Sequence, residues 1–171
     1  HALEMVERTL GSMARGGIYD HIGFGFHRYS TDERWFAPHF EKMLYDQALL
    51  VMAYTECFLA AGNVEYRRTA EEVLGYVLRD MSDNAGGFYS AEDADSEGVE
   101  GKFYLWTERE ILEVLGEEDG RLAAALFGVE SSGNFAAEID RANILYIEQS
   151  VARAAENLGA SADELRERFN D

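Results

Sequence analysis

The sequence is poor in cysteine and in basic residues, and each shortage excludes a class of protein. A single cysteine, Cys57, allows neither an internal disulfide nor a Cys-x-x-Cys redox pair, so we expect a reducing, cytoplasmic compartment. Only 15 Lys and Arg stand against 33 Asp and Glu, a formal net charge of -18 that argues against nucleic acid and anionic membranes as partners. No run of about 18 apolar residues occurs, so no membrane-spanning helix is predicted.

The chain is rich in side chains that build a core. Of its 171 residues, 47% are hydrophobic and 12% aromatic, a composition that excludes a disordered protein despite the high charge. The length suits one domain of ordinary size. Cys57 stands among apolar residues and is expected to be buried as a small hydrophobe.

Apolar residues recur at helical spacing over most of the chain. The spacing predicts a helix ending near Arg15, with Gly16 and Gly17 supplying the left-handed freedom of a helix end. The only proline, Pro38, suits a first helical turn, so a long, mostly buried helix is expected over 38–61. A tight turn joins it to an amphipathic helix over 64–81, which makes an αα-hairpin. Shorter helices are predicted over 107–115, 119–127, 150–158 and 161–169, the first and last starting with capping boxes.

The periodicity changes in the middle of the chain. Aromatic-rich runs at 86–91 and 102–106 predict a small β-hairpin within residues 86–106, with a long acidic tip between them. A brief strand is expected over 143–147. The predicted fold is therefore mainly α, built from αα-hairpins with one small β-hairpin.

Residues 16–37 form a long segment without helical period, and long loops inside compact domains are usually functional. Aromatic faces beside a few polar groups are typical of a site for a sugar-like ligand. An alternative is that this loop is buried and that its polar groups pair internally. The candidate ligand-binding residues here are Tyr19, Asp20, His21, Phe26, Arg28 and Trp35, with His27 as a candidate proton-transfer group.

The start of the predicted long helix carries a second group of polar residues. His39, Lys42 and Asp46 are spaced to share one helix face, with Glu41 beside them. We therefore take His39 and Asp46 as candidate catalytic residues and Glu41 as a ligand contact. The alternative is that these charges complement the helix dipole, with Glu41 and Lys42 in solvent.

The acidic tip resembles the opening of an EF-hand, because Asp93 and Asp95 alternate before Gly98. The twelfth position is Tyr104 instead of Glu, which excludes an EF-hand. We predict no metal or cofactor, with a looser divalent-cation site at the tip as the alternative. Asp93 is a candidate catalytic carboxylate and Asp95 a candidate ligand contact, both facing the aromatic loop. The alternative is that these carboxylates are solvated charges of the loop.

These segments resemble the family of thioredoxin-domain-containing proteins related to spermatogenesis-associated protein 20, also called the YyaL-like family. The resemblance extends from residue 16 to about 147 and is specific. The matching stretches are GGIYDHIGFGFHRYS (16–30), Trp35, PHFEKMLYDQA (38–48), GGFYSAEDADSEG (86–98), GKFY (101–104), Trp106 and NIL (143–145).

The resemblance implies a thioredoxin-like domain followed by a six-hairpin (α/α)6 toroid, akin to sugar epimerases and six-hairpin glycosidases. Residues 1–171 then correspond to a single segment of the toroid, not to a complete domain. No redox role transfers, because the thioredoxin-like domain and its cysteines are absent from this sequence.

Two classes of function remain open at this point. The first is carbohydrate-active chemistry: proton transfer by His27 or His39 with a carboxylate, or hydrolysis by two of Asp20, Asp46, Asp93 and Asp95. The second is a non-enzymatic scaffold that binds a protein or peptide. Convergence of His27, Arg28, His39, Asp46 and Asp93 on one concave pocket would favour the first class, and their scatter into separate internal pairs would favour the second. The expected partners are a small sugar-like ligand and the rest of the parent chain, with a homodimer of the isolated segment.

Overall fold

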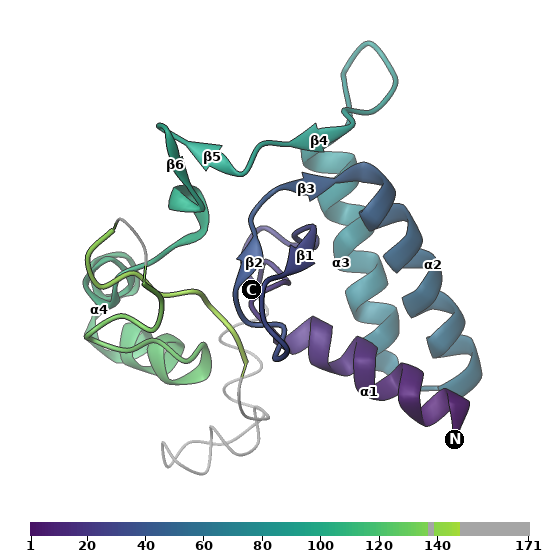
Figure 1. Ribbon diagram of the computed structural model, residues 1–171, viewed down its shortest axis with the longest axis horizontal. Coiled ribbons are helices and arrows are strands. Elements are labelled where there is room, and N and C mark those ends of the chain that lie inside the picture. Colours follow the sequence, from purple (N-terminus) through teal and green to yellow (C-terminus); the bar gives the residue numbers. More distant parts are fainter. Residues whose placement is uncertain (137–138, 148–171) are drawn as a thin grey trace. The chain divides into compact units, whose positions relative to one another are not determined.

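The computed structural model describes residues 1–136 and 139–147, and the chain divides into two compact units, 1–104 and 105–171 (Figure 1). The described part is mainly helical, with four α-helices and small two-stranded antiparallel sheets. None of these helices is both long and apolar enough to cross a membrane. The predicted helices over 150–158 and 161–169 lie outside the described residues.

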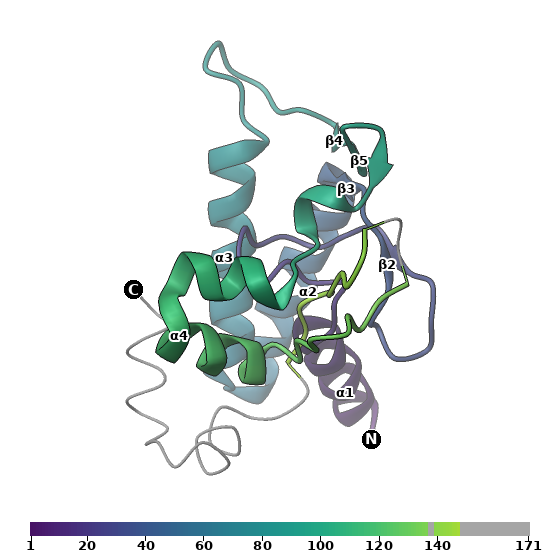
Figure 2. The same ribbon diagram turned by 90° about the vertical axis from the view of Figure 1, so that its left-hand side faces the viewer.

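Three helices form the frame of the first unit: α1 (Ala2–Arg15), α2 (Leu44–Ala61) and α3 (Val64–Asp80). α2 and α3 lie side by side and antiparallel (Figures 1 and 2), which confirms the αα-hairpin. Gly62 ends α2 in the left-handed conformation, with φ of 73°. Gly16, in contrast, ends α1 in an extended conformation, so the predicted left-handed end is wrong. A Cβ at Gly16 would collide with the backbone of Trp35.

The core of this unit combines aromatic and aliphatic side chains, and it joins all three helices to the loop after α1. Cys57 is buried in it, as predicted. The Tyr54 hydroxyl donates a hydrogen bond to the Leu10 carbonyl at 2.7 Å, which fastens α2 to α1. The buried members are Leu10, Ile18, Tyr19, Phe26, Tyr54, Cys57, Tyr66, Ala70 and Val73.

The prediction of a mostly buried helix that begins at Pro38 is wrong in both its burial and its start. Leu49, Met52 and Leu59 of this helix are exposed. β2 (Pro38–His39) pairs with β1 (Tyr29–Ser30), and β3 (Lys42–Met43) pairs with β4 (Ala91–Glu92), so α2 begins only at Leu44. The backbone of residues 38–43 is therefore bonded to segments before and after it in the sequence. Helical spacing does not reveal such long-range pairing, which overrides a local preference.

The predicted β-hairpin is also wrong in its pairing. Instead, β5 (Asp95–Ser96) and β6 (Val99–Glu100) form a tight hairpin inside the acidic tip. Its two-residue turn uses Glu97 and Gly98, both with positive φ, as the favoured hairpin turns require. The second predicted strand is instead the short 3-10 helix η1 (Lys102–Tyr104), followed by the first residues of the second unit.

The second unit contains α4 (Glu108–Leu126), which starts with the predicted Thr107–Glu110 capping box. Gly116 interrupts it with a φ of 81°, so the two predicted helices meet at a kink, visible in Figure 2. The expected strand over 143–147 is reduced to a single bridge between Asn143 and Trp106. A small core of Ile111, Ala123 and Leu145 holds this unit together.

Candidate functional site

The first unit contains a cavity of about 620 Å³. The loop after α1, strands β3 and β4, the end of α3 and η1 all contribute to its wall. Its lining combines aromatic rings with charged groups of both signs. The lining residues are Asp20, Gly23, Lys42, Tyr76, Arg79, Asp80, Met81, Tyr89, Ala91, Glu92, Phe103 and Tyr104.

Lys42 is buried in the wall of this cavity, with 1% of its surface exposed. Its Nζ donates to Asp20 Oδ2 at 2.7 Å and to the Phe24 carbonyl at 2.9 Å. The ammonium also lies 4.4 Å from the ring centroid of Tyr76 and 4.8 Å from that of Tyr104. The reading of Lys42 as a solvated charge is therefore wrong, because the side chain is enclosed and fully paired.

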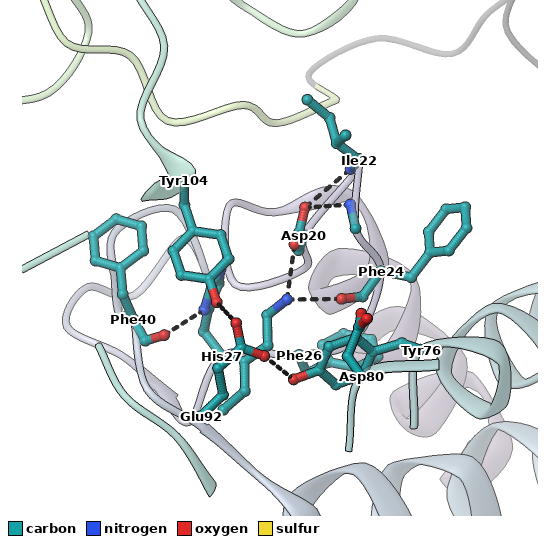
Figure 3. A network of polar contacts seen from close by, with 12 residues as sticks. Asp20, Ile22, Phe24, Phe26, His27, Phe40, Tyr76, Asp80, Glu92 and Tyr104 are labelled. Atoms are coloured by element: carbon teal, nitrogen blue, oxygen red, sulfur yellow. Dashed lines mark hydrogen bonds and ion pairs between the residues drawn. The ribbon is translucent and has the colours of Figure 1, made fainter. Parts of the chain in front are cut away.

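Asp20 links this ammonium to the loop after α1. Its Oδ1 accepts hydrogen bonds from the backbone N–H groups of Ile22 and Gly23, at 3.0 and 2.9 Å (Figure 3). Burial alone would raise the pKa of this carboxyl, but the Lys42 ammonium and the two N–H groups hold the pKa below its ordinary value. Asp20 is therefore an ionised residue that organises the loop.

Glu92 is the centre of a second arrangement in the cavity wall. Tyr76 donates its hydroxyl proton to one carboxylate oxygen at 2.5 Å, and Tyr104 donates to the other at 2.7 Å (Figure 3). Burial and the hydrogen bond to Glu92 raise the pKa of both phenols, so both remain protonated donors. None of these three residues was among the sequence-based candidates, although Glu92 belongs to the acidic segment that the sequence singled out.

His27 does not line the cavity and is only 2% exposed. Its Nδ1 donates to the Phe40 carbonyl at 2.9 Å, and its ring packs edge-on against Phe40 and Tyr104. Burial, and then the nearby charge of Lys42, lower the pKa of His27 from 6.5 to about 3. The imidazole is thus neutral, and it supports the ring of Tyr104 from behind.

Four other predicted site residues come together outside the cavity lining, and we call them the His39 cluster: Arg28, His39, Glu41 and Asp46. Arg28 pairs with Glu41 at 3.0 Å. His39 Nε2 lies 3.7 Å from Glu41, and its Nδ1 contacts Glu100 at 2.6 Å. His39 precedes α2, so the predicted shared helix face with Asp46 is wrong.

Asp46 is the unusual member of the His39 cluster. Its Oδ2 is the buried side-chain atom without a hydrogen-bond partner among the residues that the structure describes. Burial raises the pKa of Asp46, the charge of Arg28 opposes that shift, and Glu41 adds to it.

The remaining candidates are structural or exposed. Tyr19 and Phe26 are core residues, and Tyr19 donates to Glu72 at 2.6 Å. Phe26 is held through its backbone by Gln47, which sequence reasoning did not single out. A ring nitrogen of His21 lies 3.1 Å from the Gly16 carbonyl oxygen, and Trp35 packs on the core. Asp93 and Asp95 are both exposed, and the Asp93 carboxylate accepts a hydrogen bond from the Asp95 N–H.

Of the sequence-based candidates, Asp20 is therefore the one that lines the cavity. His27, Arg28, His39, Asp46 and Asp93 do not converge on it, so the arrangement expected for the first class of function is not formed by these five residues. Within residues 1–136 and 139–147, no three His, Cys, Asp or Glu side chains are grouped as metal ligands would be. The arrangement is suited to bind a small polar molecule against aromatic rings, with Glu92 as a carboxylate that faces it.

Comparisons with known proteins identify relatives of this chain. No family model matches it. Spermatogenesis-associated protein 20 of human and of mouse are each 40% identical to it over 190 residues, covering 99% of this chain and 24% of theirs. An uncharacterized protein of Caenorhabditis elegans is 41% identical over 154 residues, or 81% of this chain and 21% of that protein. The chain spans between about a fifth and a quarter of the length of these relatives. It is thus homologous, over almost its whole length, to a portion of spermatogenesis-associated protein 20.

Proposed function

We propose that the cavity of the first unit binds a small sugar-like ligand for proton-transfer chemistry of the epimerase or isomerase type. The observation that carries this proposal is the composition of the wall: four aromatic rings (Tyr76, Tyr89, Phe103 and Tyr104) surround carboxylates that are already held in place. A volume of about 620 Å³ is within the range of small-molecule sites. Ring faces stack on the apolar face of a sugar, while carboxylates accept hydrogen bonds from its hydroxyls.

Glu92 is the group we assign to proton transfer in this proposal. It faces the cavity, and two phenols fix both its oxygens, so its orientation is set before a ligand arrives. We do not assign proton transfer to His27 or His39, because neither residue lines the cavity.

Hydrolysis fits the cavity less well. A glycosidase needs one carboxyl that stays protonated until it donates to the leaving oxygen. The pKa of Asp20 is instead held low, and its two oxygens are engaged by Lys42 and the loop backbone. Asp46, whose pKa is raised, is not part of the cavity lining.

The test uses two exposed aromatic residues. Phe103 lines the cavity and is 72% exposed, while Phe88 is 57% exposed and does not line it. A panel of monosaccharides titrated calorimetrically into the full-length protein should show binding that Phe103→Ala weakens about tenfold and Phe88→Ala leaves unchanged. Absence of binding by every sugar, or equal losses in the two variants, would refute the proposal.

A second observation supports a different role for the helices. Tyr45, Leu49, Met52 and Leu59, which we call the α2 stripe, are 48%, 62%, 59% and 75% exposed. Their spacing of four, three and seven residues places them along one face of the helix. Such an apolar stripe normally packs against a neighbouring helix. We propose that α2 and α3 form one hairpin of an (α/α)6 toroid, whose other hairpins cover the stripe in the longer protein.

In the isolated 171-residue chain, the α2 stripe should then pair with a second copy. Light scattering is expected to show a dimer that Leu49→Glu converts to monomer, because a charge at this position opposes apolar packing. Val114→Glu, at a 70% exposed position of α4, is the matched control. A monomeric wild-type chain at high concentration would contradict self-association. It would favour the scaffold alternative, in which the stripe binds another protein.

A further inference from the structure

The charges that line the cavity do not cancel. Its two cations are each neutralised by their own partner: Lys42 by Asp20, and Arg79 by Asp80, whose Oδ2 lies 2.5 Å from Nη2. Arg79 also donates to the Gly23 carbonyl at 2.6 Å, so this guanidinium is fixed to the protein. Glu92 is the third carboxylate of the lining, and neither of the two cations is paired with it.

Glu92 lacks a cationic partner even though one starts beside it. β3 and β4 pair Lys42 directly opposite Glu92, which places both side chains on the same face of the ladder. The Lys42 ammonium nevertheless extends past Glu92 to Asp20 and the Phe24 carbonyl. Within residues 1–136 and 139–147, no Lys, Arg or His nitrogen lies within 4.0 Å of the Glu92 carboxylate.

The Glu92 carboxylate has unused capacity to accept hydrogen bonds. Each of its oxygens accepts one phenol proton, while an ionised carboxylate offers about four acceptor positions. The rings of Tyr89 and Phe103, which line the same cavity, are 51% and 72% exposed. Aromatic faces beside a carboxylate attract a cation through both the ring quadrupole and the full charge.

We propose that the ligand of this cavity carries a protonated amine, as an amino sugar or an amino polyol does. This inference rests on the proposed function, because it names the ligand class of the same cavity. The ammonium donates to the free acceptor positions of Glu92, and the carbon skeleton lies against Phe103. A ligand with a carboxylate or phosphate at this position is disfavoured, because it would meet an uncompensated negative charge.

Three probes that differ at one carbon test the inference: glucosamine, glucose and N-acetylglucosamine. Each is titrated into the full-length protein at pH 6.5 and constant salt. Glucosamine should bind about tenfold more tightly than the two neutral sugars, since a hydrogen bond between charged groups contributes about that much. Glu92→Gln keeps the shape and one acceptor oxygen, and it should bind all three probes equally.

A matched control is needed because the whole chain has a formal charge of -18, which attracts any cation. Glu100→Gln removes the same charge from β6 outside the cavity lining, and it should retain the preference for glucosamine. Thermal melting of both variants checks that they fold. If Glu92→Gln fails to fold, the comparison of the three probes on the wild-type protein still decides whether an amine is preferred.

The outcomes separate the two proposals. Equal binding of glucose and glucosamine overturns the amine inference and leaves sugar binding intact. An equal loss of the preference in Glu92→Gln and Glu100→Gln overturns the assignment to Glu92. Failure of these three sugars and of every other monosaccharide in the panel to bind refutes the proposed function itself.

Discussion

Replacing Lys42 by methionine tests whether one buried ammonium organises the first unit. The side chain is 2% exposed and its partner Asp20 is 11% exposed, so the pair is screened little by solvent. Methionine has nearly the same length and fills the same space, so the change removes the charge without opening a large cavity. It leaves Asp20 ionised and the Phe24 carbonyl without its donor.

The expected loss is large for a single substitution. Removing one partner of a buried ion pair costs about 3–5 kcal/mol of unfolding free energy, because the other charge remains buried without compensation. With an m-value of about 2 kcal/mol/M in urea, the midpoint should fall by about 2 M. Arg67→Met, which breaks an exposed pair with Glu71, should cost at most about 1 kcal/mol.

The assay must report the first unit alone, because two compact units need not unfold together. Trp35 packs on the core of the first unit, whereas Trp106 belongs to the second. In a Trp106→Phe background, urea unfolding followed by fluorescence therefore reports residues 1–104.

A double variant separates lost charge from lost packing. Asp20→Asn keeps the Oδ1 acceptor for the loop but removes the charge, so the double variant should be about 2 kcal/mol more stable than additivity predicts. A loss under about 1 kcal/mol in Lys42→Met would refute the reasoning.

Two further predictions concern pH and backbone geometry. The pKa of His27 is about 3 in the folded chain, against a reference value of 6.5. Between these pH values the unfolded chain binds a proton at this imidazole that the folded chain does not, so the free energy of unfolding decreases as the pH drops from 6.5 toward 3. His27→Asn should flatten that slope in urea midpoints measured at several pH values, and an unchanged slope would contradict it. Gly25 and Gly62 have φ of 80° and 73°, but a Cβ at Gly25 would lie 2.5 Å from the Tyr76 ring and one at Gly62 would meet nothing. Gly62→Ala should therefore cost about 1 kcal/mol by strain, and Gly25→Ala at least about 2 kcal/mol more; equal melting temperatures would count against this.

The helices were predictable because their evidence is local. α1 and α3 follow apolar spacing with a period near 3.6, and Thr107 with Glu110 marks the start of α4 within four residues. The start of α2 was not predictable in this way. Residues 38–43 are bonded to β1 and β4, and nothing in their own composition shows that.

The cavity was harder to predict than the helices. Asp20 was found because it stands in a loop of aromatic and polar residues. Tyr76, Glu92 and Tyr104 were missed because their role depends on hydrogen bonds that join residues 12 and 16 positions apart. An imidazole among aromatic residues predicts a site at His27, but the sequence does not show that Phe40 and Tyr104 pack against its ring.

The pairing of Lys42 with Glu92 has a consequence for the order of folding. It joins residues 50 positions apart and encloses the complete α2–α3 hairpin, so we expect the chain to close this loop after the two helices have come together. On this expectation the cavity is completed late, by a strand contact that the hairpin brings within reach. A ligand would bind preferentially to protein molecules in which β3 and β4 are already paired. It would therefore slow unfolding more than it speeds folding.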